Sequence, residues 1–222
     1  MTGEIKMQLE ESQTHPPIFI GLEDSDVAVQ PSPSTSLLFR EIIETLLLTL
    51  FIFWLVNTAT GRYRVQGHSM DPTLQEGEYL IINKLSYYLS EPERGDIIVL
   101  HFPRDRSREY IKRIIGLPGD VVEISNQQVK VNGVLLTEPY IKELTNSTGR
   151  WEVPEDNFFV MGDNRNNSSD SRSWSFLPRS DIVGRAWIIY WPPPLWKIVP
   201  HFDYAAANSV LDPFLNEQQQ NG

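Results

Sequence analysis

The chain of 222 residues is long enough for one sizeable domain or two small ones, and its 41% hydrophobic and 22% charged residues are typical of a folded protein. Its formal net charge of -10 argues against a general nucleic-acid binder, because such a protein needs a basic stripe to neutralise phosphates. The sequence contains no cysteine, which excludes a disulfide, a thiolate nucleophile and a cysteine zinc site.

The first segment, residues 1–36, is acidic and polar. It carries six acidic side chains against one basic side chain and ends in the run Gln30-Pro31-Ser32-Pro33-Ser34-Thr35-Ser36. Such a segment cannot bury enough apolar surface to offset the entropy lost on ordering. The composition therefore predicts a disordered acidic arm.

Residues 37–60 hold the apolar stretch of the chain. Its purely apolar centre, Leu46 to Val56, covers only about 17 Å as a helix, whereas Ile42 to Thr60 covers about 28 Å, close to the ~30 Å hydrocarbon core of a bilayer. If this helix spans the bilayer, Glu44 lies near one membrane–water interface, where Arg40 at i-4 can pair with it. We expect one transmembrane anchor.

Two other interpretations of this stretch are a buried core helix and a cleavable signal peptide. Cleavage fits poorly, because the preceding arm is long and acidic rather than positively charged. Basic residues flank the stretch on both sides, Arg40 before it and Arg62 and Arg64 after it, so the charge count leaves the orientation open.

Residues 61–200 show short strand patterns separated by turn residues, without a long helical period, and predict a mainly β domain. Asn132-Gly133 predicts a tight hairpin. The proline-rich run Trp191 to Trp196 is expected to end the last strand beside the membrane, and residues 201–222 to form an unstructured tail. The expected strands are Tyr79–Asn83, Asp96–Phe102, Tyr110–Ile115, Val121–Ile124, Val129–Val131, Phe158–Met161 and Ile182–Tyr190.

Ser69 lies in the run Gly67-His68-Ser69-Met70-Asp71-Pro72-Thr73, just beyond the apolar stretch. The proline indicates an extended or turning segment rather than a helix interior. A serine hydroxyl becomes a good nucleophile only when a base takes its proton, and without one Ser69 is an ordinary loop serine. Nine residues separate Ser69 from Thr60, so it lies within about 30 Å of the anchor's end.

Lys112 is the candidate base. In the strand-like segment Tyr110 to Gly116, alternation places Lys112 on the same face as Tyr110 and Ile114. Desolvation on such a face lowers a lysine pKa and favours the neutral amine that can accept a proton. The alternative is a lysine at a sheet edge with its ammonium in water. Arg113, on the opposite face, needs a separate partner.

The polar loop Met161 to Arg172 interleaves two acids and two arginines with hydroxyl groups. It does not match a calcium loop, because a serine stands where the glycine belongs and a tryptophan where the bidentate glutamate belongs. Ion pairs and hydroxyl donors of this kind can position a neutral amine without charging it. The acids are Asp163 and Asp170, the arginines Arg165 and Arg172, and the hydroxyl of interest Ser168.

A serine-histidine-aspartate site is the other catalytic interpretation. Of the four histidines, His101 is the serious candidate, because His15 and His201 fall in the terminal segments and His68 adjoins the serine. A zinc site is not indicated, since paired ligand spacing is absent.

Taken together, these segments resemble type I signal peptidases, the membrane-anchored enzymes that remove signal peptides from exported preproteins. Val65 to Leu74 resembles the nucleophile motif, Tyr110 to Asp120 the general-base motif and Met161 to Trp174 the supporting motif. Gly184-Arg185-Ala186 extends the likeness, which covers about Tyr63 to Pro192.

The resemblance implies a role for each matching residue. Ser69 matches the nucleophile, Lys112 the general base and Ser168 the hydroxyl that orients the lysine amine. Two structural ion pairs are implied, Asp170 with Arg172 and Asp163 with Arg113. The chain departs from some members at Gly67, where they carry a second oxyanion donor, and at Ser175, which replaces a common glycine.

The implied fold is a coiled, largely antiparallel β domain, and the implied reaction is cleavage after an Ala-x-Ala site through an acyl-enzyme, without a cofactor. Partners would be signal peptides and membrane lipid. The catalytic domain would lie on the outer or lumenal side of the cell membrane or an internal energy-transducing membrane.

Two rival functions use the same features differently. A self-cleaving serine-lysine regulator would need a cleavable site and a partner domain within the chain, and neither is evident. A membrane-tethered β module that only binds exported chains would leave the Ser69 and Lys112 arrangement idle.

Overall fold

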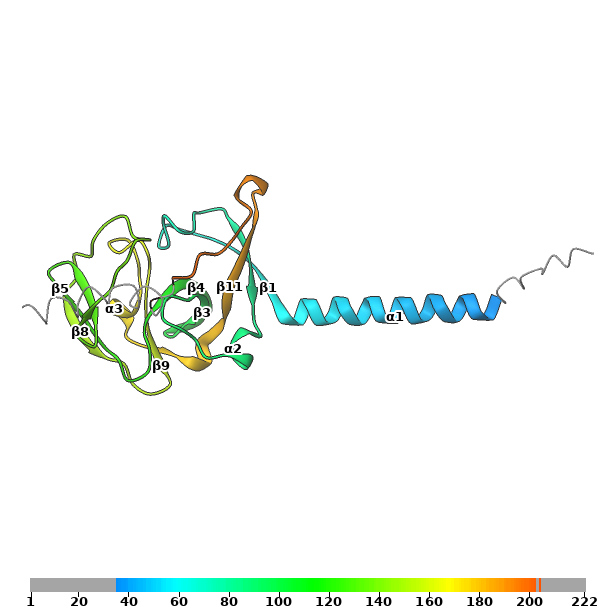
Figure 1. The fold of residues 1–222 in the computed structure, drawn as a ribbon, viewed down its shortest axis with the longest axis horizontal. Helices are drawn as coiled ribbons and strands as arrows, with labels where there is room; N and C mark the ends of the chain where they lie inside the picture. Colours follow the sequence, from blue (N-terminus) through cyan, green and yellow to red (C-terminus); the bar gives the residue numbers. More distant parts are fainter. Residues whose placement is uncertain (1–34, 203, 205–222) are drawn as a thin grey trace, which may run out of the picture. The chain divides into compact units, whose positions relative to one another are not determined.

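The computed structural model describes residues 35–202 and residue 204. Helix α1, Thr35–Ala59, is continuous over 25 residues (Figure 1). Its part from Ser36 to Ala59 is long and apolar enough to cross a membrane, and none of that window is buried in protein, which does not fit a buried core helix. Arg40 Nε and Glu44 Oε1 pair at 2.6 Å, as the i, i+4 spacing predicts.

The chain divides into two compact units between Leu46 and Leu47, within α1, and the β domain belongs to the second. The expected acidic arm, apart from its last two residues, lies outside the described residues, and so does the tail beyond residue 204. The domain boundaries drawn from the sequence therefore stay a proposal.

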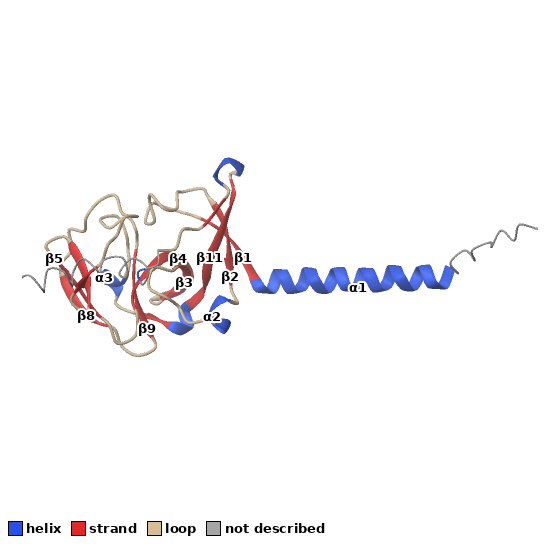
Figure 2. Ribbon diagram, viewed as in Figure 1, coloured by secondary structure: helices blue, strands red, loops and turns tan. Residues whose placement is uncertain are grey.

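Beyond α1 the described chain is mainly antiparallel β-sheet, as predicted, with only short helical turns (Figure 2). One sheet has the order β1-β2-β11-β3-β4-β9-β10 with β12 on β11, and a smaller sheet has the order β7-β6-β5-β8. The short helices are α2 (Ser86–Leu89), α3 (Ser171–Trp174), η1 (Arg179–Asp181) and η2 (Pro193–Leu195). The strands are β1 (Thr60–Arg64), β2 (Tyr79–Asn83), β3 (Ile97–Phe102), β4 (Asp105–Gly116), β5 (Val121–Ser125), β6 (Gln128–Val131), β7 (Val134–Leu135), β8 (Gly149–Glu152), β9 (Asn157–Met161), β10 (Leu177–Pro178), β11 (Ile182–Trp191) and β12 (Lys197–Ile198).

Each expected strand is present, and the hairpin prediction at Asn132-Gly133 is confirmed. Both residues have positive φ, 53° and 82°, and they join β6 to β7. The sequence pattern missed β1 and β8, whose charged residues break the alternation. The proline-rich run ends β11 at Trp191, as predicted, but β11 is not the last strand, because after η2 the chain returns as β12 and pairs Ile198 with Ile188 of β11.

Buried apolar side chains from β2, β3 and β11 form one of three core clusters, and three residues of the loop between β1 and β2, Val65, Met70 and Leu74, belong to it. Met70 and Leu74 are 1% and 0% exposed, so that loop is fixed at two points from within. On the same sheet β3 and β4 pair Ile98 with Lys112. The core thus holds the serine loop and the lysine strand in a fixed relation.

Candidate active site

Ser69 is half-buried in the loop between β1 and β2, immediately before the buried Met70. Asn164, in the loop after β9, makes two hydrogen bonds to the backbone of this segment. Its backbone N–H donates to the Ser69 carbonyl oxygen at 3.0 Å, and its side-chain amide donates to the His68 carbonyl oxygen at 3.0 Å. The Ser69 backbone is therefore held by the core on one side and by Asn164 on the other.

Lys112, on β4, reaches Ser69. Its Nζ lies 2.8 Å from Ser69 Oγ and 2.8 Å from the carbonyl oxygen of Ile111, to which it donates. The lysine is 3% exposed, so the alternative of a sheet-edge lysine in water is wrong. Two residues 43 positions apart are thus brought into direct hydrogen-bond contact.

The environment of Lys112 favours its neutral form. The pKa of the amine is lowered from its ordinary 10.5 to about 8, mainly by burial; Asp170 and Asp163 act in the opposite direction, and Arg172 adds to the lowering. Burial is the largest of these effects, because a dry site penalises the ammonium ion. The lowered pKa brings the neutral amine, which a general base requires, within reach of neutral pH.

Arg113, which points away from Lys112, has Asp163 as its partner. The guanidinium donates from Nε to Oδ1 at 2.9 Å and from Nη2 to Oδ2 at 2.7 Å, and both side chains are almost fully buried. Thr73 of the serine loop donates its hydroxyl to the same Oδ2 at 2.6 Å. This bidentate pair therefore joins the lysine strand, the serine loop and the loop after β9.

Asp170 and Arg172 form the second expected ion pair. Arg172 donates from Nε at 2.8 Å and from Nη2 at 2.7 Å, and Asp170 is fully buried. Asp170 Oδ2 also accepts the backbone N–H of Gly162 at 3.0 Å, and Arg172 Nη1 donates to Thr145 and Ser147. The carboxylate thus fixes the turn that leaves β9.

Ser168 does not make the hydrogen bond expected of it. Its Oγ is buried and has no hydrogen-bond partner among the described residues, so the predicted bond to Lys112 is not formed. A side chain at Gly162 would collide with Ser168 Oγ and with the Ser69 carbonyl oxygen, which places the orphan hydroxyl beside the catalytic segment. The sequence pattern located Ser168 but not its bonding.

The histidine alternative fails on geometry. His101 faces Glu109 across β3 and β4, with Nδ1 3.9 Å from Glu109 Oε1. Ser69 has Lys112 as its partner instead. His101 lies three residues from Ile98, the β3 residue that faces Lys112, a separation of about 10 Å along the strand.

A cleft of about 410 Å³ opens beside Ser69 and Lys112. Its walls include the apolar side chains of Val65 and Ile111. At one wall Tyr63 donates its hydroxyl to Glu109 at 3.1 Å, and burial together with that carboxylate raises the pKa of Tyr63 to about 12. The cleft gives a bound molecule access to both Ser69 and Lys112.

Sequence reasoning missed the aromatic and acidic side chains that pack against Arg113 and Arg165. The ring of Tyr140 lies 3.9 Å from the Arg113 guanidinium carbon, and Tyr140 contacts the hydroxyl of Tyr204. Arg165 makes a buried bidentate pair with Glu138, including a 2.6 Å bond from Nη1 to Oε2. Arg165 was named as one of the arginines of the polar loop, but neither Glu138 nor Tyr204 belongs to a recognisable motif.

The described residues include no cluster of three or more histidine or acidic side chains suited to a metal ion. What they do provide is a nucleophilic hydroxyl in contact with a buried amine, two buried ion pairs that hold the surrounding loops, and an adjoining cleft. A serine hydroxyl hydrogen-bonded to a buried amine is the arrangement that serine-lysine hydrolases, peptidases among them, require.

Comparison with known proteins agrees with this class. The family described as "Signal peptidase, peptidase S26" matches residues 39–191, so the chain belongs to the S26 signal peptidase family. Signal peptidase I-1 of Synechocystis, described as probable, is 38% identical over 82% of this chain and 97% of its own length. Signal peptidase I-2 of Synechocystis, also described as probable, is 48% identical over 61% of this chain and 65% of its own. A solved signal peptidase I from Enterococcus faecalis is 33% identical, with a TM-score of 0.40, over 43% of this chain and 97% of that one.

Proposed function

We propose that this protein removes N-terminal signal peptides from exported preproteins, with Ser69 as nucleophile and Lys112 as general base, and cuts after an Ala-x-Ala-type site. The 2.8 Å contact between Lys112 Nζ and Ser69 Oγ carries the proposal, because it places a buried amine where it can take the hydroxyl proton. Membership of the S26 family supports the substrate class.

The reaction follows from this geometry. Neutral Lys112 takes the Ser69 proton as Oγ attacks the scissile carbonyl carbon, and the Ser69 backbone N–H stabilises the oxyanion. The ammonium then protonates the leaving amine, which departs as the new N-terminus of the mature protein. A water, deprotonated by Lys112, hydrolyses the Ser69 ester and releases the signal peptide as a carboxylic acid.

Ser168 has a place in this scheme. A neutral lysine amine has two N–H donors and one lone pair, and the lone pair is engaged by the Ser69 O–H. One N–H donates to the Ile111 carbonyl oxygen at 2.8 Å, which leaves a second to be satisfied. The orphan Ser168 Oγ is the acceptor we assign to it.

The structural pairs have a supporting role. Asp163 with Arg113, and Asp170 with Arg172, are placed as positioning residues, because each pair joins separate loops around Lys112 without contacting Ser69 Oγ. Each carries its own hydrogen bonds to neighbouring backbone or hydroxyl groups, so the loops are held in one arrangement.

Membrane attachment is the remaining part of the proposal. Helix α1 is the anchor, and the β domain acts on the outer or lumenal side, close to the bilayer, because Ser69 follows the anchor by ten residues. The cleavage site of a membrane-spanning signal would be presented at the same level. Domain limits of 1–36 for the arm, 37–60 for the anchor, 61–200 for the catalytic domain and 201–222 for the tail accompany this assignment.

The test uses the purified full-length protein with a preprotein that carries an Ala-x-Ala site, and mass spectrometry of the products. Ser69→Ala and Lys112→Ala should each abolish cleavage. Matched controls are Ser90→Ala and Lys142→Ala, both on the exposed surface, which should cleave like wild type. Full activity of either catalytic variant would contradict the mechanism.

The same experiment separates the rival functions. A self-cleaving regulator would cut its own chain without added preprotein, and a binding module would retain the preprotein uncut. Protease added outside intact cells, with an inner-compartment control, tests the side on which the domain lies.

A further inference from the structure

The cavity of about 900 Å³ at the end of helix α1 is larger than the catalytic cleft and has no part in the reaction. We propose that it binds the headgroup of an anionic membrane phospholipid. The inference rests on the membrane attachment proposed above, and it adds a second site with its own ligand.

The position of the cavity is fixed relative to the helix end. Thr58, in the last turn of α1, lines it together with Lys84. The Lys84 backbone N–H donates to the Ala59 carbonyl oxygen at 2.9 Å, and Asn83 pairs with Thr60. At about 1.5 Å per residue, the span from Ser36 to Ala59 covers about 36 Å, slightly more than the hydrocarbon core, so its end reaches the headgroup layer.

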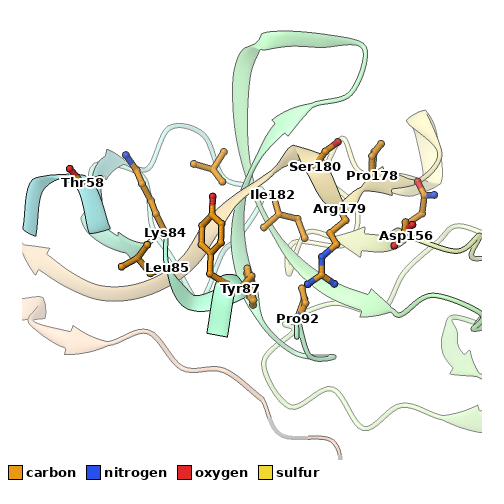
Figure 3. A pocket seen from close by; sticks show the side chains of 13 residues that line it. Thr58, Lys84, Leu85, Tyr87, Pro92, Asp156, Pro178, Arg179, Ser180 and Ile182 are labelled. Atoms are coloured by element: carbon orange, nitrogen blue, oxygen red, sulfur yellow. The ribbon is translucent and has the colours of Figure 1, made fainter. Parts of the chain in front are cut away.

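Charge points to an anionic ligand. Lys84 is half-buried, and its ammonium group makes no ion pair or side-chain hydrogen bond within residues 35–202. Figure 3 shows Lys84 on the Thr58 side of the pocket, with Arg179 and Asp156 on the opposite side. Arg179 is already paired with Glu91, which leaves Lys84 as the cation available to a phosphate group.

The surroundings point to a lipid rather than to a soluble anion. Tyr87 and Ile182 give the cavity apolar surface between the two charged ends, which suits the glycerol and upper acyl chains (Figure 3). On α2, Tyr88, which lines the cavity, and Leu89, which follows it, are 84% and 89% exposed. Exposed tyrosine and leucine side chains at this depth fit the interface between headgroups and acyl chains.

Native mass spectrometry of the detergent-solubilised full-length protein tests the proposal, with phosphatidylglycerol and phosphatidylcholine as defined probes. Wild type should retain phosphatidylglycerol in preference, and Lys84→Gln should weaken that retention about fivefold. Lys84→Arg should restore it, and the exposed control Lys142→Gln should match wild type.

Three outcomes overturn the lipid assignment. They are equal retention by wild type and Lys84→Gln, equal retention of the two lipids, and displacement of phosphatidylglycerol by an equal concentration of inorganic phosphate, which would mark a soluble-anion site. Rescue by Lys84→Arg separates the loss of the ligand from a folding defect.

Carrying out the series also in the Ser69→Ala background separates the two proposals. If the lipid site is correct, retention there should equal retention by the wild-type protein, because Ser69 does not line this cavity. Failure of preprotein cleavage with lipid retention intact would overturn the proposed function alone, and the reverse result would overturn the lipid site alone.

Discussion

Thr73 donates a 2.6 Å hydrogen bond to Asp163, a residue 90 positions away that also receives two hydrogen bonds from the Arg113 guanidinium. Thr73 belongs to the loop that carries Ser69, and Arg113 follows Lys112 on β4. One buried carboxylate therefore fixes the position of the Ser69 loop relative to β4, in addition to the direct contact between Ser69 and Lys112.

Removing the Thr73 hydroxyl should make the position of the Ser69 loop relative to Lys112 less fixed. Thr73→Val keeps the shape of the side chain but leaves Asp163 Oδ2 one donor short, which costs about 1–3 kcal/mol of stability. Cleavage should fall through kcat rather than KM, because Thr73 does not line the cleft beside Ser69. Steady-state kinetics and chemical denaturation measure the two effects.

The controls for this prediction are Thr73→Ser, which keeps the hydroxyl and should restore most of kcat, and Thr137→Val on the exposed surface, which should change neither quantity. Wild-type kcat in Thr73→Val would show that Asp163 positions the loop without Thr73.

The pH dependence of cleavage follows from the lowered pKa of Lys112, about 8. The base must be neutral, so kcat/KM should rise with pH, about tenfold per pH unit well below 8, and level off above it. Because burial lowers the pKa of Lys112, the rising part of the kcat/KM profile, its acid limb, should lie far below the ordinary lysine value of 10.5. A profile that stays flat into acid would mean that Lys112 is not the base.

The same burial has a cost in stability. Because folding lowers the pKa of Lys112 from 10.5 to about 8, the unfolded chain binds more protons between those values, and stability rises with pH across that window. At pH 7 the buried amine costs on the order of 3 kcal/mol. Lys112→Met should therefore be inactive but more stable than wild type at pH 7.

Chemical denaturation at pH 7 and at pH 10.5 measures this difference, which should shrink at the higher pH. The exposed Lys142→Met should show no such difference. A Lys112→Met variant less stable than wild type at pH 7 would indicate that its packing and its bond to Ile111 outweigh the desolvation cost.

Local patterns marked Ser69 and Lys112 as candidates, because strand alternation placed the lysine on an apolar face and the proline placed the serine in a turn. Their roles as nucleophile and base came from the family resemblance. The Arg113 and Asp163 pairing came from the resemblance alone. The hairpin at Asn132-Gly133 followed from turn chemistry. These features depend on residues close together in the chain or on a recurring motif.

Contacts that depend on distant partners were not predictable in this way. Glu138 reaches Arg165 from a loop with no repeating pattern, and the strand after the proline-rich run is specified by pairing with β11 rather than by its own two residues. Ser168 was located by its motif, yet its hydroxyl is unpartnered, because a motif fixes residue types and not side-chain rotamers.

Asp170 and Arg172 offer a test of the electrostatics around the base, because they act on Lys112 in opposite directions. The Asp170 carboxylate raises the pKa of Lys112 and the Arg172 guanidinium lowers it. Asp170→Asn should therefore move the acid limb of kcat/KM to lower pH, and Arg172→Gln should move it to higher pH. A loss of packing alone would not shift the limb in opposite directions.

Both variants break a buried pair, so each should lose about 3–5 kcal/mol of stability. Circular dichroism identifies the temperature at which both remain folded, and the pH profiles are measured there. Arg150→Gln, whose partners Glu123 and Glu152 lie on the surface, is the matched control and should leave the limb in place. Shifts of the same sign in the two variants would show that structural loosening, and not the charge on either side chain, sets the pKa of Lys112.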